Sequence, residues 1–553
     1  MKALNIPVGI SNFEIRNNGF YYVDKTGLIE ELLKTEAEVT LITRPRRFGK
    51  TLGMSMLESF FDIRKNSRKL FEGLEIARQS ELCSKWMNQC PTVSVSFRQV
   101  DGLNFTSAYD MLTMVFADLY NKHLYLLEDS HVTEFQKKTF TNIAHGCGSE
   151  KEVKSSLVLL TTMMQQHYGK AVVLLIDEYD VPVAKANAHG YYNEMLDVMK
   201  GLLQALKDNQ ALCFAVVTGC LKIAKESIFT GLNNLKVLTL TDVRFDEYFG
   251  FTDAEVRDML AYYDLSGRYE EVKEWYDGYR FGNVEVYCPW DVINYCDLLK
   301  ADSEAHPQDY WSNTSGNAMV RRFIDKADTR TRNEKLISGE EIVKEIRQEL
   351  TYSELDSSIE NLWSVLFTTG YLTQRGQVGT DTFKLAIPNL EIRRLFIKQI
   401  REWFRETSQS DGETLNEFCN AFPRQNPKKI EELFGDYLWN TISIRDTAPA
   451  KKENFYHGIL LGLLGYKSNW LIKSNAESGI GYSDILVEVP DNRTGIVIEL
   501  KYAENGNMDT ACEEALKQIE DRDYTARLRD DGMRNIIKYG IACYKKNCKV
   551  VLG

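Results

Sequence analysis

The chain has little of what marks a secreted, zinc-binding or membrane-embedded protein. Its 11 cysteines are scattered, odd in number and without a C-x-x-C pair, which favours reduced thiols in a cytosolic protein. The seven histidines show no zinc-ligand spacing. No run approaches the roughly 18 apolar residues of a membrane span, and the opening residues lack the apolar stretch of a signal peptide. We therefore expect a cytoplasmic protein without membrane contact.

Proline and net positive charge are also scarce. Only 11 of the 553 residues are proline, which argues against long disordered linkers. The net charge is −12, whereas a protein that coats nucleic acid without sequence preference is usually basic. Any contact with nucleic acid must therefore come from a local basic surface. At about 150 residues per domain, the length suggests three or four units.

The first 250 residues alternate strand-like and helix-like stretches. Near-continuous apolar runs occur at 38–43, 171–180 and 211–219, and residues 92–97 alternate with period two. Buried strands separated by helices indicate a parallel sheet with helices on both faces. The predicted fold class is therefore α/β.

The rest of the chain divides into two parts. Residues 251–440 are mostly helical, and the stretch NLWSVLFTTGYLT ends in a bend and a short strand pair, compatible with a winged-helix unit. From residue 441, a helix, a charged hairpin, a second helix and a last strand form a further α/β unit. We therefore expect domains at 1–250, 251–440 and 441–553.

A phosphate-binding motif follows the first strand. The segment RPRRFGKT ends that strand and opens a helix. Gly49, Lys50 and Thr51 fit the pattern G-x-x-x-x-G-K-[ST], in which backbone N–H groups hold phosphates, the lysine reaches the β- and γ-phosphates and the threonine holds Mg²⁺. Arg44 replaces the first glycine, and because arginine does not favour a positive φ, the loop conformation is left open. Alone, this motif could be a basic turn that binds nothing.

Two later strand ends strengthen the nucleotide site. The buried run VVLLIDEYD carries Asp177 and Glu178 at its end. Asp177 suits coordination of Mg²⁺ through water, and Glu178 suits polarisation of the attacking water. Thr218 ends a third buried strand, where its hydroxyl can sense the γ-phosphate. Together these residues predict that the chain binds ATP and Mg²⁺ and hydrolyses ATP.

The stretch GYSDILVEVPDNRTGIVIELKYA carries charges where a buried hairpin would carry apolar residues. Residues i and i+2 of a strand share a face, so Glu499 and Lys501 emerge side by side. With the turn at Asp491–Asn492, Asp484 lies opposite Glu499, with Cβ atoms about 5 Å apart. Two carboxylates that close repel each other unless they share a cation. The alternative is a charged strand pair that faces solvent.

The sequence resembles the bacterial family of AAA-ATPase-like proteins with a C-terminal PD-(D/E)XK nuclease domain. The resemblance covers nearly the whole chain and is carried by IPVGISNFEIRNNGFYYVDKT, LITRPRRFGKTLGMSML, TGCLKIAKESIFTGLNNL, WYDGYRFG with VYCPWDVINY, and NFYHGILLGLLG. In that family Arg-Pro-Arg-Arg is usual in the phosphate loop. The resemblance implies a P-loop ATPase of the additional-strand, catalytic-glutamate type, a helical middle region and a restriction-endonuclease-like α/β domain.

The resemblance also implies roles for residues at the ATPase site. Arg46 and Arg47 would line the phosphate entrance, with a solvated basic turn as the alternative. Arg244, in TDVRFDEYFG, is a candidate arginine finger against the alternative of an ordinary surface arginine.

In the nuclease core, Asp484 matches the first acid, and Glu499 and Lys501 match (D/E)-x-K. The acids would hold Mg²⁺, which activates water and stabilises the leaving oxygen. Lys501 would stabilise charge on the phosphoryl oxygens or orient the water. Two neighbours can join them, Glu477 as a further metal ligand and Gln518 as a polar partner, although Gln518 could equally be a helix-surface residue.

Two functions remain in view. The first is an ATP-dependent enzyme whose helical middle region couples the ATPase to a Mg²⁺-dependent nuclease acting on DNA. The second is a nucleotide-gated switch or scaffold that binds a protein or DNA partner and has an inactive nuclease core. The acidic charge favours a protein partner, whereas the complete Asp-Glu-Lys set argues against an inactive core. A homo-oligomer is also open, since AAA-like ATPases often work as rings.

Overall fold

The computed structural model describes residues 4–222, 229, 235–311, 320, 336, 339–347, 349–350, 354, 358–407, 412–441, 452–467, 469–478 and 481–553. The chain forms two compact units. The N-terminal unit comprises Met1–Ser315 and Val343–Ile392, and the C-terminal unit comprises Gly316–Ile342 and Arg393–Gly553. No helix within the described ranges is long and apolar enough to cross a membrane.

Five strands form a parallel sheet in the N-terminal unit, in the order β2-β3-β4-β1-β5. Every residue of β1 and β3 is buried, as a sheet covered on both faces requires. The predicted α/β class and parallel sheet are therefore confirmed, and β4 is the additional strand between β1 and β3. The strands are β1 (Val39–Thr43), β2 (Thr92–Ser96), β3 (Val172–Asp177), β4 (Leu212–Gly219) and β5 (Leu235–Leu238).

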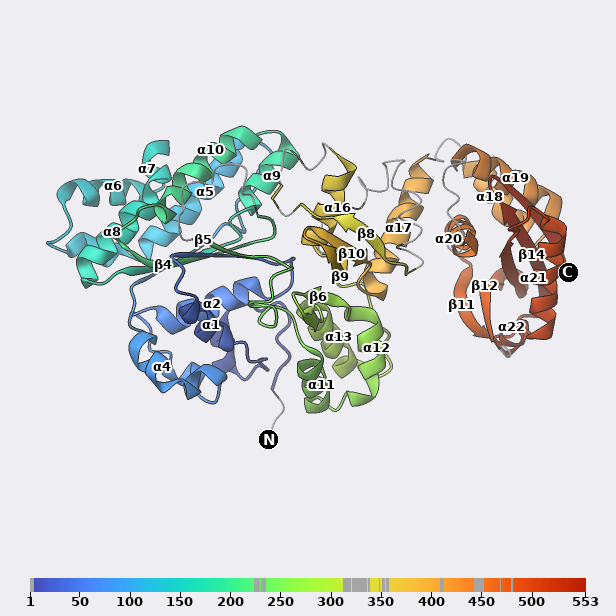
Figure 1. The fold of residues 1–553 in the computed structure, drawn as a ribbon, viewed down its shortest axis with the longest axis horizontal. Coiled ribbons are helices and arrows are strands. Elements are labelled where there is room, and N and C mark those ends of the chain that lie inside the picture. The colour runs from blue at the N-terminus through green and yellow to red at the C-terminus, as the bar shows by residue number, and fades with distance from the viewer. Residues whose placement is uncertain are drawn as a thin grey trace. The chain divides into compact units, whose positions relative to one another are not determined.

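Helices cover both faces of this sheet. Figure 1 shows α1, α2 and α4 on one side and α5, α8 and α10 on the other. Capping boxes at Asn104 and Thr133 fix where α5 and α6 begin, because each side chain accepts a hydrogen bond from an N–H three residues later. The helices are α1 (Gly27–Thr35), α2 (Lys50–Phe61), α3 (Arg68–Phe71), α4 (Ser80–Trp86), α5 (Phe105–Asn121), α6 (Glu134–Ala144), α7 (Glu150–Lys154), α8 (Ser156–Tyr168), α9 (Val181–His189) and α10 (Tyr192–Leu202).

The rest of the N-terminal unit is helical with two small sheets. The predicted bend and strand pair are present, since α16 ends before Gly370, whose φ is 90°, and the antiparallel pair β9–β10 follows. Strand β8 joins this pair in the order β8-β10-β9, while β6 pairs with β7. The elements are α11 (Asp253–Tyr262), α12 (Tyr269–Tyr276), α13 (Pro289–Ala301), α16 (Ile359–Thr368), β6 (Tyr279–Phe281), β7 (Val284–Val286), β8 (Ile342–Glu345), β9 (Thr373–Gly379) and β10 (Thr382–Ala386).

The C-terminal unit is built on a mixed sheet in the order β11-β12-β13-β14-β15, in which only the pairing of β13 with β14 is parallel. This is the second α/β unit that the sequence predicts. Its strands are β11 (Leu471–Ser478), β12 (Gly481–Val489), β13 (Thr494–Tyr502), β14 (Asn535–Tyr544) and β15 (Asn547–Leu552). Its helices are α17 (Leu390–Thr407), which starts in the N-terminal unit, α18 (Gly412–Ala421), α19 (Pro427–Thr441), α20 (Lys452–Leu464), α21 (Met508–Asp521) and α22 (Ala526–Asp530).

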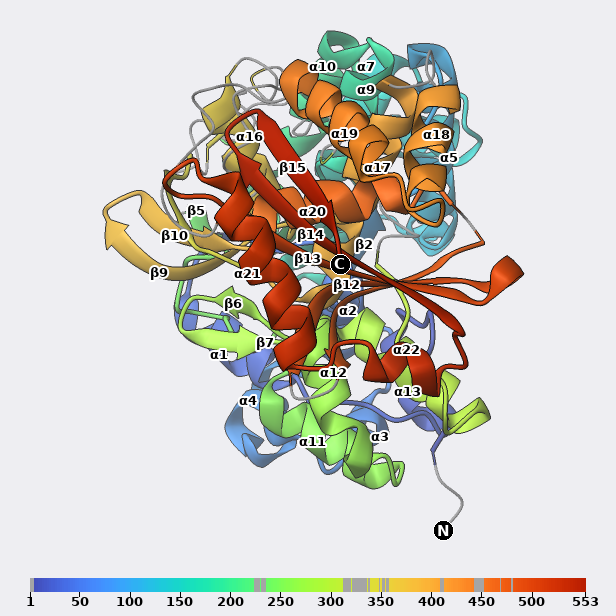
Figure 2. The same cartoon turned by 90° about the vertical axis from the view of Figure 1, so that its right-hand side faces the viewer.

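The two faces of the mixed sheet pack against different helices. Ile485 and Ile498 belong to the core shared with α18, α19 and α20. Leu486 and Val497, one residue away on each strand, pack against α21 and α22. Figure 2 shows α21 lying across the sheet. Side chains that share the face of Val497 therefore point towards α21.

Candidate functional site

The phosphate loop joins β1 to α2. Its left-handed residues are Arg47 at φ 74° and Gly49 at φ 85°, whereas Arg44 is not left-handed. The strain considered for Arg44 is therefore absent. Instead its fully buried guanidinium donates to the carbonyl groups of Thr239 at 2.8 Å and Phe245 at 3.1 Å. Burial lowers the pKa of Arg44 to about 10.

Lys50 organises the loop from its inner side. The buried ammonium donates to the carbonyl oxygens of Arg44 and Pro45, both at 3.0 Å, and lies 3.6 Å from a carboxylate oxygen of Glu178. Burial acts to lower the pKa of Lys50, but the surrounding Cys220 and acidic side chains raise it overall. The ammonium therefore stays charged.

The next two carbonyl groups of the loop are held in the same way. The indole Nε1 of Trp311 donates to the Arg46 oxygen at 3.5 Å, and the Cys288 thiol donates to the Arg47 oxygen at 3.9 Å. Four consecutive carbonyl groups, from residue 44 to residue 47, are thus occupied by donors. Peptide N–H groups point opposite to their carbonyls, so this arrangement suits an anion on the other side of the loop.

Asp177 ends β3 beside the loop. The Thr51 hydroxyl donates to its Oδ2 at 2.9 Å, and the Thr218 hydroxyl donates to its Oδ1 at 2.6 Å. Ser96, which the sequence did not single out, donates to Oδ2 at 3.3 Å from the paired end of β2. Burial raises the pKa of Asp177. The structure therefore brings Thr51, Asp177 and Thr218 together, and the first two could ligate one cation.

Glu178 follows in the left-handed conformation, at φ 54°. Its Oε2 is buried and has no hydrogen-bond partner within the described residues. The side chain lines the same cavity as Lys50 and Thr51. A buried acceptor without a protein donor is suited to hold a water molecule.

A cavity of about 380 Å³ opens in front of the loop. Apolar and aromatic residues of the N-terminal segment, among them Tyr21 and Val23, line it together with Trp290 of α13. The Arg47 guanidinium lies 4.0 Å from the centre of the Trp290 ring. The basic residues around this cavity are Lys25, Arg46, Arg47, Lys50, Arg98 and Lys185.

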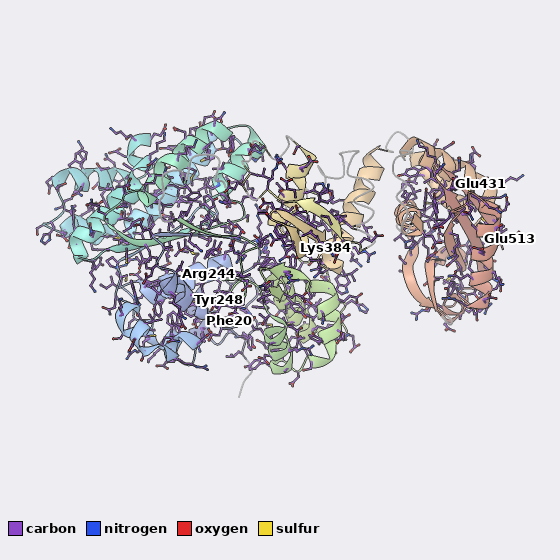
Figure 3. All side chains as sticks on the ribbon, in the orientation of Figure 1. Phe20, Arg244, Tyr248, Lys384, Glu431 and Glu513 are labelled. Atoms are coloured by element: carbon purple, nitrogen blue, oxygen red, sulfur yellow. The ribbon has the colours of Figure 1, made fainter. Side chains whose placement is uncertain are left out.

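Arg98 and Lys185 were not found from the sequence, since neither belongs to a phosphate-binding pattern. Arg98 follows the end of β2, at the edge of the sheet where the carboxyl ends of the parallel strands meet. Its position in the fold, rather than a sequence motif, indicates that it belongs to the site. Arg244, labelled in Figure 3, is exposed and does not belong to the residues described as lining the cavity. Within this unit the structure therefore gives no support to Arg244 as the arginine finger.

In the C-terminal unit, β12 and β13 pair in the predicted register. Ile485 faces Ile498, and the ladder runs to the turn. One step further, the Asp484 N–H lies 3.4 Å from Oε2 of Glu499. Both acids share the face of Val497, which α21 covers. The prediction that Asp484 lies across from Glu499 is confirmed.

The two carboxylates differ in their surroundings. Asp484 Oδ2 accepts a hydrogen bond from the Leu500 N–H at 2.8 Å and is partly exposed. Glu499 is only 1% exposed. Burial, and then the neighbouring Asp484 charge, raise the pKa of Glu499. A divalent cation between the acids would reverse their repulsion.

Lys501 and Gln518 complete this face. The Lys501 ammonium lies 3.3 Å from Glu499 Oε1, and the Gln518 amide on α21 donates to the same oxygen. Burial opposes the charge on Lys501, but Glu453, Glu499 and Asp484 raise its pKa overall. Gln518 is therefore brought into the site rather than left on the helix surface.

Glu453 was missed by the sequence analysis. From the first turn of α20, its carboxylate lies 3.9 Å from the Lys501 ammonium and accepts from the Tyr502 N–H at 3.4 Å. His457, one turn later, has its Nε2 2.9 Å from the Asp484 carbonyl oxygen. Glu453 and His457 are four residues apart on a helix that directly precedes the hairpin. This spacing places both side chains on one helix face, and it was the feature of the sequence that could have indicated them.

Glu477 lies in β11, where its backbone pairs with Tyr482. Its side chain lies outside the described residues, so its role as a metal ligand stays a prediction. Among the described side chains no group of three or more His, Cys, Asp or Glu residues is arranged to hold a metal ion. Asp484 and Glu499 therefore form a pair rather than a ready-made cage.

Comparison with known proteins matches two parts of the chain to family models. Residues 7–229 match the family described as "Predicted AAA-ATPase", and residues 451–552 match the "PD-(D/E)XK nuclease superfamily". The chain therefore carries a predicted AAA-ATPase domain followed by a PD-(D/E)XK nuclease superfamily domain, which confirms the resemblance.

One curated protein and one solved structure are similar to this chain. A protein of Azotobacter chroococcum mcd 1, described as "Uncharacterized protein in vnfD 5'region", is 26% identical over 96% of this chain and 95% of its own length. The solved Aeropyrum pernix ORC2 protein (ADPNP-ADP complexes) is 11% identical, spans 72% of this chain and 97% of its own, and has a TM-score of 0.24.

Proposed function

We propose that this protein is an ATP- and Mg²⁺-dependent nuclease that acts on DNA. The observation that carries the proposal is that each unit holds a complete set of reactive side chains. One set is Lys50, Thr51 and Glu178, which line a cavity, with Asp177 hydrogen-bonded to Thr51. The other is Asp484, Glu499 and Lys501 on one sheet face, with Gln518 of α21 hydrogen-bonded to Glu499. As part of this proposal, the chain has three domains, at 1–250, 251–440 and 441–553, and is located in the cytoplasm.

In the ATPase, the chain's own residues would bind the phosphates and Mg²⁺, and would orient and polarise the attacking water. The loop N–H groups, Arg46, Arg47 and Lys50 hold the phosphates. Thr51 and Asp177 hold Mg²⁺, and Thr218 fixes Asp177 through its 2.6 Å hydrogen bond. Oε2 of Glu178, which no donor among the described residues contacts, would hold and polarise the attacking water.

In the nuclease, Asp484 and Glu499 would hold Mg²⁺, with Glu477 as a further ligand. The residues fit the ion because two carboxylates lie side by side and one of them is almost completely buried. When bound, Mg²⁺ supplies an activated water and charge neutralisation at the phosphodiester. Lys501 would stabilise charge on the phosphoryl oxygens, and Gln518 would orient the Glu499 carboxylate through its hydrogen bond to Oε1.

Cleavage of plasmid DNA tests this function. Purified wild type is incubated with Mg²⁺, with and without ATP, beside Glu499→Ala and Lys50→Ala. We expect cleavage by wild type, none by Glu499→Ala, and loss of the ATP effect in Lys50→Ala. Cleavage that persists in Glu499→Ala contradicts the nuclease site.

A nucleotide-gated switch or scaffold is the second candidate. It is favoured by charge, because residues 451–553 contain 15 acidic and 15 basic residues and so offer no excess of positive charge for DNA. In this role the helical middle region binds a protein partner, or copies of the chain form a ring. Tight ATP binding without cleavage of DNA or RNA under any condition would favour it.

A further inference from the structure

The phosphate loop is supported from behind by residues that the proposed ATPase reaction does not use. Pro45 packs against Gly370, where an added Cβ would lie 2.9 Å from the proline ring. Phe48 packs edge-on against Tyr279, with ring centres 4.9 Å apart. The supports come from WYDGYRFG, VYCPWDVINY and the end of α16, the first two being motifs to which the proposed reaction gives no role.

Behind the two donors Trp311 and Cys288 lie two acids. The backbone N–H of Trp311 donates to Oε1 of Glu391 at 2.6 Å. The Cys288 thiol and the Glu391 carboxyl both approach the side chain of Asp291. The chain of contacts therefore runs from the acids to the donors and from the donors to the loop carbonyls.

Asp291 and Glu391 are fully buried, each at 0% exposure. Within the described part of the chain, both oxygens of Asp291 and Oε2 of Glu391 have no hydrogen-bond partner as carboxylates. Two adjacent buried negative charges with three unpaired oxygens would be costly. One proton between them supplies a donor and removes one charge. Burial raises the pKa of Asp291, and burial with the Asp291 charge raises that of Glu391.

Among the residues that the structure describes, Arg47 is the permanently charged cation that faces Asp291. It belongs to the phosphate loop, so a second negative charge on the pair would draw it away from a bound phosphate. The charged and titratable neighbours are Arg47, Cys288, Tyr276, Tyr279, Asp309 and Tyr310.

We propose that the Asp291–Glu391 pair positions the phosphate loop for nucleotide binding, and does so only while its two carboxyl groups share one proton. This inference rests on the proposed nucleotide site. It gives the Cys288–Asp291 part of VYCPWDVINY a role, and it makes ATP affinity fall as the pH rises through the pKa of the pair. Above that pKa the fall approaches about tenfold per pH unit.

The experiment measures the affinity of the full chain for MgATP by calorimetry from pH 6.5 to about 9.5. Glu391→Gln is the matched variant, because its amide oxygen can still accept from Trp311 and its amide N–H can replace the shared proton. We expect it to bind ATP within about twofold of wild type at neutral pH and to lose the pH dependence. Glu391→Ala removes the acceptor and is expected to bind at least about tenfold more weakly.

Thermal unfolding of the same proteins without nucleotide separates positioning from folding. Because the folded-state pKa is raised, wild type should lose stability as pH rises over this range, whereas Glu391→Gln should not. Identical pH profiles of ATP affinity for wild type and Glu391→Gln, tight binding by Glu391→Ala, or failure of Glu391→Gln to fold would each overturn the proposal. Wild type that binds no ATP at any pH refutes the nucleotide site itself, and is thereby distinguished from failure of the pair alone.

Discussion

Restoring the glycine that the phosphate-loop pattern calls for is expected to damage this protein. Arg44→Gly leaves the carbonyl groups of Thr239 and Phe245 without their donor and removes a guanidinium lying 5.5 Å and 5.4 Å from the ring centres of Phe249 and Phe281. Each buried carbonyl left unpaired costs about 1–3 kcal/mol, and each cation–π contact contributes about 0.5–2 kcal/mol. Relief of the buried charge offsets part of this loss.

The net loss is expected to be roughly 3–5 kcal/mol, a large share of the about 5–15 kcal/mol that stabilises a typical domain. Such a loss lowers the unfolding midpoint of the N-terminal unit by roughly 6–15 °C. Differential scanning calorimetry of the full chain measures it, with the transition of that unit assigned by its shift with ATP. Arg244→Gly, at an exposed arginine, is the control and is expected to leave the midpoint unchanged. An Arg44→Gly protein as stable as wild type, or one that binds ATP more tightly, would refute the reasoning.

Three further outcomes follow from the sites. DNA cleavage at limiting Mg²⁺ should fall as the pH is lowered through the raised pKa of Glu499, because a protonated carboxyl is a poor ligand; a pH series read by gel checks this, and a flat profile contradicts it. Gln518→Leu should weaken Mg²⁺-dependent cleavage by about 10–100-fold while Mn²⁺ partly restores it, as expected for a residue that orients a ligand; equal loss in both metals argues against that role. Thr218→Val should weaken Mg²⁺-dependent ATP turnover by about tenfold, because Asp177 loses its 2.6 Å donor; steady-state phosphate release measures it, and an unchanged rate excludes the hydrogen bond as a contributor.

The hairpin of the nuclease domain could be predicted closely because its information is local. Period-two alternation assigns faces, and a turn at a fixed place assigns the register, so Asp484 and Glu499 follow from the sequence alone. The ends of β1 and β3 were predictable for a similar reason. Parallel strands place their carboxyl ends at one edge of the sheet, so Lys50 and Asp177 had to be neighbours.

The supports of the phosphate loop could not be predicted, because they lie far away in sequence. Trp311 contacts Arg46 of the loop across 265 residues of sequence, and it contacts Glu391 across 80 residues. No periodicity marks such residues, and an isolated cysteine or tryptophan in a helical region reads as ordinary core. The buried position of the Arg44 side chain could not be predicted for the same reason, since its carbonyl acceptors belong to Thr239 and Phe245.

The dispersed support of the loop limits how the ATPase can be divided or moved between proteins. The matched ATPase region ends at residue 229, yet Cys288, Trp311 and Gly370, which hold the loop, all lie beyond it. A fragment that stops at residue 250 would keep every residue of the phosphate pattern and lose the scaffold that shapes it. An ATPase region transferred without roughly the next 140 residues would therefore lack the contacts that hold the phosphate loop. We expect the ATPase region and the helical region that follows it to be exchanged between proteins as one piece.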